Sequence, residues 1–120
     1  MTSRRILIVD DEQALLRLIS VCMKRAGHES VCCASAAEVA LLDGSGWDAA
    51  IVDLGLPDTE GPSLILELLH RYPNIRVLAS SGSPFDLDAI PGHHRSRVAF
   101  LAKPYLPRNL IEALDALLAH

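Results

Sequence analysis

The sequence of 120 residues contains no long hydrophobic run, no concentrated basic face and no repeated or low-complexity segment. The apolar run nearest the amino terminus covers only residues 6–9, far too short for a signal peptide or a membrane span. The formal net charge is −4 and the basic residues are scattered, which disfavours direct binding of DNA or RNA. These absences predict a soluble, cytoplasmic protein that binds neither membranes nor nucleic acid directly.

Cysteine is also scarce. The three cysteines, Cys22, Cys32 and Cys33, are odd in number and match no metal-binding or redox spacing. Neighbouring residues of a strand point to opposite faces, so Cys32 and Cys33 should not form a disulfide with each other. We expect reduced, mostly buried thiols, as in a cytosolic protein.

What is present has the composition of a globular domain: half of the residues are hydrophobic and 22% are charged. A chain of this length forms one domain with an ordinary core that needs no disulfide or metal. We therefore expect a single domain over residues 1–120. The Met1-Thr2-Ser3 start suggests a natural amino terminus.

Short apolar runs alternate with longer segments of helical period. The apolar runs predict buried strands over residues 6–9, 28–33, 47–53, 75–80 and 98–102. Helical stripes predict helices over residues 15–26, 35–42, 62–73 and 107–118. The second helix opens on a capping box between Ser35 and Glu38, and Gly27 can end the first in a left-handed cap. This order predicts an α/β fold, with a parallel sheet covered by helices on both faces.

Polar side chains follow four of these strands where each strand ends. Asp10 and Asp11 follow the first strand, Asp53 ends the third, Ser81 follows the fourth and Lys103 follows the fifth. The carboxyl ends of parallel strands meet at one edge of the sheet, where ligands bind in such folds. We therefore expect these side chains to meet in one cleft.

Three carboxylates in one cleft repel each other, and a hard divalent cation such as Mg²⁺ relieves that repulsion. Asp53 can then act as a carboxylate nucleophile toward a phosphoryl group, beside a cation held by Asp10 and Asp11. Lys103 supplies a positive charge for a phosphoryl oxygen and Ser81 a hydroxyl donor. Taken singly, each residue also has a structural interpretation, such as a helix cap for Asp11. Their conjunction at equivalent strand ends favours phosphoryl chemistry.

At these residues the sequence resembles a response-regulator receiver domain of two-component signalling, similar to the chemotaxis regulators, over the whole chain. The matching segments are residues 6–12, residues 53–61, Ser81-Gly82 and Lys103-Pro104. The resemblance implies a flavodoxin-like, doubly wound sheet of five parallel strands in the order 2-1-3-4-5. It also implies that Asp53 accepts a phosphoryl group from a histidine kinase or a histidine phosphotransfer protein. Catalysis would then be limited to self-catalysed phosphotransfer and autodephosphorylation.

The same resemblance implies a ligand set for Mg²⁺. Asp11 and Asp53 would bind the cation directly through their side chains, Gly55 through its carbonyl oxygen, and Asp10 largely through water. A cis bond between Lys103 and the following proline is expected as well.

Receivers convert phosphorylation into a change of surface, in which a hydroxyl residue moves and an aromatic residue of strand five turns inward. Ser81, rather than its neighbour Ser80, matches the hydroxyl position because Gly82 follows it. Phe100, three residues before Lys103, matches the aromatic position. Ordinary core packing explains Phe100 equally well.

Residues 83–97 depart from the family pattern. A fourth helix could begin after Pro84, but Pro91-Gly92 should stop it. We expect a short or distorted helix there, which leaves the usual dimer and partner surface in doubt; a homodimer stays open and the downstream protein is unknown. We interpret His93-His94 as part of a solvated loop rather than a metal site.

Three rival interpretations remain. The first is a receiver-like protein-interaction module that is not phosphorylated, against which the complete set of acids, hydroxyl and lysine argues. The second is a haloacid-dehalogenase-type phosphatase, which needs an Asp-x-Asp motif where this chain has adjacent Asp10 and Asp11. The third is a flavin binder, which the acidic loop after strand one would repel. It also stays open whether the receiver acts alone or was excised from a longer regulator or hybrid kinase.

Overall fold

The computed structural model describes residues 3–44 and 46–119. The strands are β1 (Arg5–Val9), β2 (Glu29–Cys33), β3 (Ala49–Asp53), β4 (Arg76–Ser81) and β5 (Val98–Ala102). The α-helices are α1 (Gln13–Arg25), α2 (Ala36–Ala40), α3 (Gly61–Arg71) and α4 (Pro107–Leu118). Two short 3₁₀ turns, η1 (Leu87–Ala89) and η2 (Arg95–Arg97), lie between β4 and β5. None of the helices in the described part of the chain is long and apolar enough to cross a bilayer.

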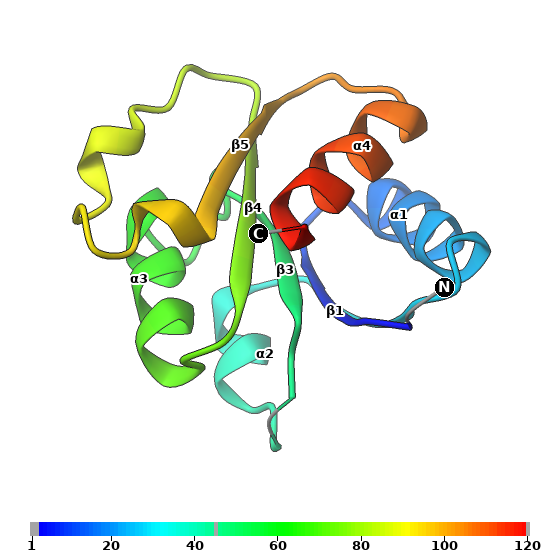
Figure 1. Cartoon of the computed structure of the whole chain (residues 1–120), viewed down its shortest axis with the longest axis horizontal. Coiled ribbons are helices and arrows are strands. Elements are labelled where there is room, and N and C mark those ends of the chain that lie inside the picture. The colour runs from blue at the N-terminus through cyan, green and yellow to red at the C-terminus, as the bar shows by residue number, and fades with distance from the viewer. Residues whose placement is uncertain (1–2, 45, 120) are drawn as a thin grey trace.

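The strands form one parallel sheet in the order β2-β1-β3-β4-β5. Helices α1 and α4 cover one face, and α2 and α3 cover the other (Figure 1). The flavodoxin-like, doubly wound arrangement predicted from the sequence is therefore confirmed. Because β1, β3, β4 and β5 are consecutive neighbours, the residues that follow these strands lie side by side at one edge.

Each face of the sheet packs into its own core. Leu7 and Val9 of β1 point toward α2 and α3, whereas Ile6 and Ile8 point toward α1 and α4. All four side chains are fully buried, because an inner strand of such a sheet is covered on both sides. This double burial explains why the strand reads as an unbroken run of branched apolar residues.

Local signals in the sequence set several element ends. Gly27 has a positive φ of 86° just after α1, as expected of a glycine that ends a helix. The backbone N–H of Glu38 donates to the Ser35 Oγ over 3.1 Å, so the predicted cap of α2 is present. This helix is shorter than predicted, since it ends at Ala40 rather than Leu42.

The cysteines are all free, but the expectation of mostly buried thiols is wrong for one of them. Cys33 is buried and Cys22 is half-buried, whereas Cys32 is exposed. Cys32 and Cys33 point to opposite faces of β2, as predicted. The strand lies at the outer edge of the sheet, where its two faces are not equally covered.

No α-helix forms between β4 and β5 in the described chain, so the expected distortion of the fourth helix is confirmed and goes further than a shortening. The segment is an extended loop with the two 3₁₀ turns, lying beside α3 (Figure 1). Ile90 is fully buried and anchors the loop in the core, next to the Pro91-Gly92 break. Phe85 packs near Phe100, with ring centroids 6.0 Å apart.

Arg97, at the end of this loop, binds the carboxyl end of α3. Its guanidinium donates to the carbonyl oxygens of Ile75 at 3.0 Å, Leu69 at 3.3 Å and Tyr72 at 2.8 Å. Carbonyl groups in the last turn of a helix lack intrahelical partners, and a cation there also faces the negative end of the helix dipole. One side chain thus ties the loop, α3 and the start of β4 together.

Candidate functional site

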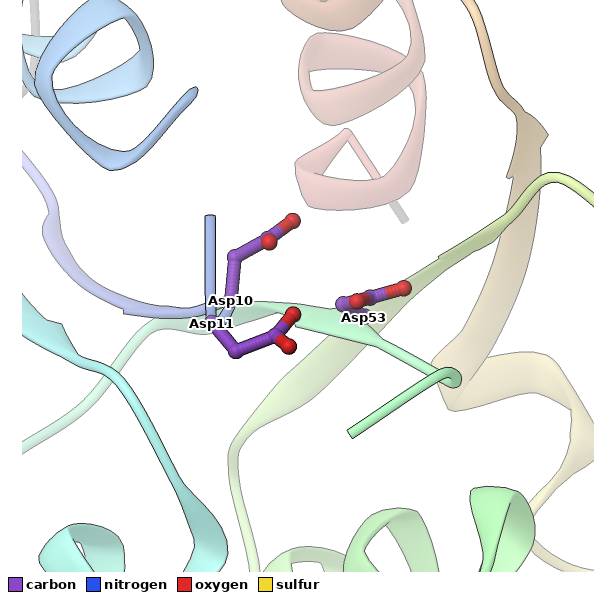
Figure 2. Close-up of side chains that lie close together, drawn as sticks. All are labelled: Asp10, Asp11 and Asp53. Carbon is purple, nitrogen blue, oxygen red and sulfur yellow. The ribbon is translucent and has the colours of Figure 1, made fainter. Parts of the chain in front are cut away.

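Asp10, Asp11 and Asp53 meet at the carboxyl edge of the sheet, as the strand order requires. Figure 2 shows their carboxylates turned toward a common space above β1 and β3. One oxygen from each residue lies within 4.8 Å of one oxygen from each of the others. Asp10 is only 3% exposed, whereas Asp11 is open to solvent. The predicted convergence of the acids is thus present in the structure.

Lys103 completes the cluster from the end of β5. Its Nζ lies 2.8 Å from Asp10 Oδ2 and 3.4 Å from Asp53 Oδ1. The backbone holds the residue in place, because Lys103 N–H donates to the Ser81 carbonyl over 2.8 Å. The Lys103-Pro104 bond is cis, as expected. Burial lowers the pKa of Lys103, but the hydrogen bond and charge of Asp10 and the charge of Asp53 outweigh it and leave the pKa raised. The ammonium therefore stays charged between the two acids.

Backbone donors orient the two buried acids. The N–H of Glu12 donates to Asp10 Oδ1 over 2.9 Å, and the N–H of Gly55 donates to Asp53 Oδ1 over 3.1 Å. No donor from the described residues forms a hydrogen bond with Asp53 Oδ2. One oxygen of Asp53 is therefore held in place while the other stays available for chemistry.

The chemistry of these side chains fits a hard divalent cation. Three carboxylates face one ammonium, so negative charge is in excess at a partly buried site. Oxygen ligands of this kind, open on one side to water, are those that Mg²⁺ prefers. Gly55 adds no bulk beside the acid, since a Cβ at that position would lie 3.6 Å from both carboxylate oxygens of Asp53.

The two serines at the end of β4 face opposite sides of the sheet. The Ser81 Oγ accepts a hydrogen bond from the Ser83 N–H over 3.0 Å and is half-buried. Phe100 and Ser81 lie on the same face, because Ala79 pairs with Phe100 and Ser81 lies two residues further along β4. Ser80 lies on the other face, 2% exposed, and its Oγ has no partner among the described residues. The arrangement favours Ser81 over Ser80 as a mobile hydroxyl.

Sequence reasoning missed Tyr105, whose hydroxyl is buried beside the lysine and makes no hydrogen bond within the described part of the chain. Burial raises the pKa of Tyr105, and so do the charges of Asp10 and Asp53. The charge of Lys103 and the nearby Ser80 hydroxyl act in the opposite direction. An aromatic residue directly after the Lys-Pro pair was the available signal.

A shallow cavity of about 500 Å³ opens next to the ammonium. It is lined by Glu12, Leu15, Gly82, Lys103, Pro104 and Tyr105. The site is therefore reachable from outside on the side of Lys103.

Comparison with known proteins gives a consistent result. The family model described as the response regulator receiver domain matches residues 6–115. The DNA-binding transcriptional regulator NtrC of Azospirillum brasilense is 27% identical over 117 residues, which cover 96% of this chain and 24% of NtrC. The regulatory protein VanR of Enterococcus faecium is 30% identical over 117 residues, 95% of this chain and 49% of VanR. The chain thus spans about a quarter of the first relative and about half of the second.

Solved structures share the fold. A response regulator receiver domain protein (CheY-like) from Methanospirillum hungatei JF-1 superposes with a TM-score of 0.85 at 28% identity, covering 98% of this chain and 95% of that one. The chemotaxis response regulator CheY4 of Vibrio cholerae gives a TM-score of 0.82 at 22% identity, covering 97% and 99%. At its lower identity, the second likeness concerns the fold alone.

Proposed function

Because the chain belongs to the response regulator receiver domain family, we propose that it accepts a phosphoryl group on Asp53 and changes its partner-binding surface in response. The donor would be the phosphohistidine of a histidine kinase or of a histidine phosphotransfer protein. The observation that carries the proposal is the meeting of three carboxylates and Lys103 at one sheet edge, with one Asp53 oxygen that accepts no hydrogen bond from the described residues. Family membership also disfavours the phosphatase and flavin-binding alternatives.

In the proposed reaction, the free oxygen of Asp53 attacks the phosphorus as the bond between phosphorus and the donor imidazole nitrogen breaks. The imidazole leaves with the electron pair of that bond and takes up a proton. A Mg²⁺ ion held by Asp10, Asp11, Asp53 and the Gly55 carbonyl would neutralise charge on the phosphoryl oxygens. The N–H of Gly55 keeps the second Asp53 oxygen oriented during the attack.

Lys103 would change partners during this reaction. Its Nζ already lies 3.4 Å from Asp53 Oδ1, so a phosphoryl oxygen attached to Asp53 falls within its reach. Moving toward that oxygen means leaving Asp10, now 2.8 Å away, whose charge would then be balanced by the cation. A lysine is suited to this step, because its three donors sit on a flexible stem.

The response would pass through the face of β4 and β5 that carries Ser81 and Phe100. Ser81 would turn its hydroxyl toward a phosphoryl oxygen, and Phe100 would follow into the space left behind. Phe100 is half-buried and packs near Phe85 of the irregular loop, which supports a role in moving that loop. Phenylalanine has no hydroxyl, so such a switch would act by shape. Plain core packing remains the alternative for Phe100.

Labelling with acetyl phosphate tests the proposal directly. With Mg²⁺ present, we expect the intact mass to rise by one phosphoryl group, and we expect no labelling when a chelator removes the cation. The cation is needed because three carboxylates otherwise repel the incoming phosphate. A protein that binds Mg²⁺ but gains no mass from acetyl phosphate or a phosphorylated kinase would instead be a receiver-like interaction module.

Replacement of the two serines separates their roles. Ser81→Ala should lower the rate of labelling by about ten- to a hundredfold, since it removes a hydroxyl donor to charged oxygen worth roughly 1.5–3 kcal/mol. Ser80→Ala is the matched control: it deletes a buried hydroxyl that has no partner among the described residues, and should leave the rate unchanged. Rates are measured by mass spectrometry at fixed acetyl phosphate and Mg²⁺. Equal rates for the two variants would contradict the role of Ser81.

A further inference from the structure

Helix α2 receives its cap from a distant carboxylate. Both oxygens of Asp58 accept backbone hydrogen bonds from the first turn of α2, Oδ1 from Ala36 N–H at 3.1 Å and Oδ2 from Ala37 N–H at 3.0 Å. Glu38 N–H donates to Ser35 Oγ, and the next N–H along bonds within the helix. Every free N–H of the first turn is thus satisfied, two of them by one residue from another segment. These bonds also lower the pKa of Asp58.

Asp58 belongs to the segment that shapes the phosphorylation site, residues 54–60 between β3 and α3. The start of this segment is held by the Leu54 N–H, which donates to the Ser80 carbonyl over 2.8 Å, and by Leu56, which is 4% exposed. Between Leu56 and the start of α3, the bonds of Asp58 are the ones in the described chain that reach another element. Gly55, three residues earlier, therefore lies in a loop fixed at one end by the core and at the other by α2.

Helix α2 and the loop of residues 54–60 stabilise each other. Helix α2 has five residues, too few to form alone, so its first turn depends on contacts from outside. The loop is exposed at Gly55, Pro57 and Asp58, so little burial restrains it. The Asp58 carboxylate, through its two hydrogen bonds, joins the exposed loop to the short helix. A change in the conformation of either one should therefore alter the other.

We propose that Asp58 is a positioning residue for the phosphorylation site, acting through α2 to hold the loop that presents the Gly55 carbonyl and the Asp53 carboxylate. This inference rests on the proposed function, since it assigns Asp58 a role in binding the cation that function requires. Binding and ordering are linked in both directions, so Mg²⁺ at the site should in turn tighten the start of α2.

Calorimetric titration with Mg²⁺ tests the inference in the full chain. Asp58→Ala should weaken Mg²⁺ binding by about tenfold, the low end of the effect of residues that orient metal ligands. Asp58→Asn keeps one acceptor oxygen, so its Mg²⁺ affinity should lie between those of Asp58→Ala and the wild type. Glu67→Ala is the matched control, because it removes an exposed carboxylate of α3 that forms no hydrogen bond or ion pair within the described part of the chain, and should keep wild-type affinity.

A second measurement separates positioning from general weakening of the fold. In the wild type and in Glu67→Ala, Mg²⁺ should slow solvent exchange of the Ala36 and Ala37 amides, followed by NMR; in Asp58→Ala it should not. If Asp58→Ala binds Mg²⁺ with wild-type affinity, or keeps the Mg²⁺ effect on these amides, the inference about Asp58 is overturned and the proposed function still stands. A wild type that binds no Mg²⁺ overturns the proposed function and the inference with it. Should Asp58→Ala not fold, Asp58→Asn takes its place in both comparisons.

Discussion

Replacement of Asp53 by Asn is expected to abolish phosphoryl labelling completely. An amide oxygen is a poor nucleophile, and we expect that the other acids cannot substitute. Asp10 is held by Lys103 at 2.8 Å, and among the described residues no backbone N–H orients Asp11 as the Gly55 N–H orients Asp53. The measurement is intact mass after treatment with acetyl phosphate and Mg²⁺. Asp43→Asn is the matched control, since it removes one exposed acid that precedes the start of β3, whereas the site lies at the end of that strand, and it should label as the wild type does. Labelling that persists in Asp53→Asn would place the phosphoryl group elsewhere.

The same substitution should change stability in opposite directions with and without the cation. In a chelator, Asp53→Asn removes repulsion from two acids and attraction from one lysine, a net gain of about 1 kcal/mol. For a domain of this size that raises the melting temperature by roughly 3–6 °C. With excess Mg²⁺ the wild type gains more stability than the variant, because the variant has lost a cation ligand. A wild type whose melting temperature is unaffected by Mg²⁺ would contradict the metal site.

Arg97→Ala should cause a large loss of stability for a substitution outside both the site and the hydrophobic core. Three carbonyl oxygens, those of Leu69, Tyr72 and Ile75, lose a charged donor at once. Partial exposure lets water replace some of these bonds, so we expect a loss of about 2–4 kcal/mol in the free energy of unfolding. Urea denaturation followed by circular dichroism measures it.

Two further variants show whether geometry or charge accounts for that loss. Arg97→Lys keeps the charge but cannot reach three carbonyls at once, so it should lose more than half of the stability that Arg97→Ala loses. Arg17→Ala removes the same charge from an exposed position of α1 and should have little effect. If Arg97→Ala and Arg17→Ala unfold at the same urea concentration, the loop is held by its apolar contacts instead.

Much of the fold was predictable because buried positions require apolar residues, so the pattern of apolar residues along the sequence indicates which elements are covered. An inner strand such as β1 is covered on both faces, so it must be apolar throughout, and the amphipathic stripes of α1 and α4 follow from packing on the sheet. The path of residues 83–97 was not predictable beyond the breaks at Pro84 and Pro91. Its course depends on Arg97 reaching the end of α3, a contact without any local pattern.

The site was predictable to the same extent as the topology. Asp10, Asp11, Asp53 and Lys103 each follow a strand, and the parallel sheet alone brings them to one edge. The contacts of Asp58 and the burial of the Tyr105 hydroxyl could not be deduced in that way. Asp58 bonds to residues 21 and 22 positions away, and the Tyr105 hydroxyl is buried by the way the chain turns after β5.

The contact between Lys103 and Asp10 has a consequence for the free domain. In the proposed function, a divalent ion entering the site would draw Asp10 away from an ammonium that is covalently tethered and always present, so its binding would weaken that ion pair. The tethered Lys103 ammonium would therefore limit the apparent affinity of the site for the ion. If Asp53 accepts a phosphoryl group as proposed, the rate of that reaction should therefore rise with the concentration of free Mg²⁺.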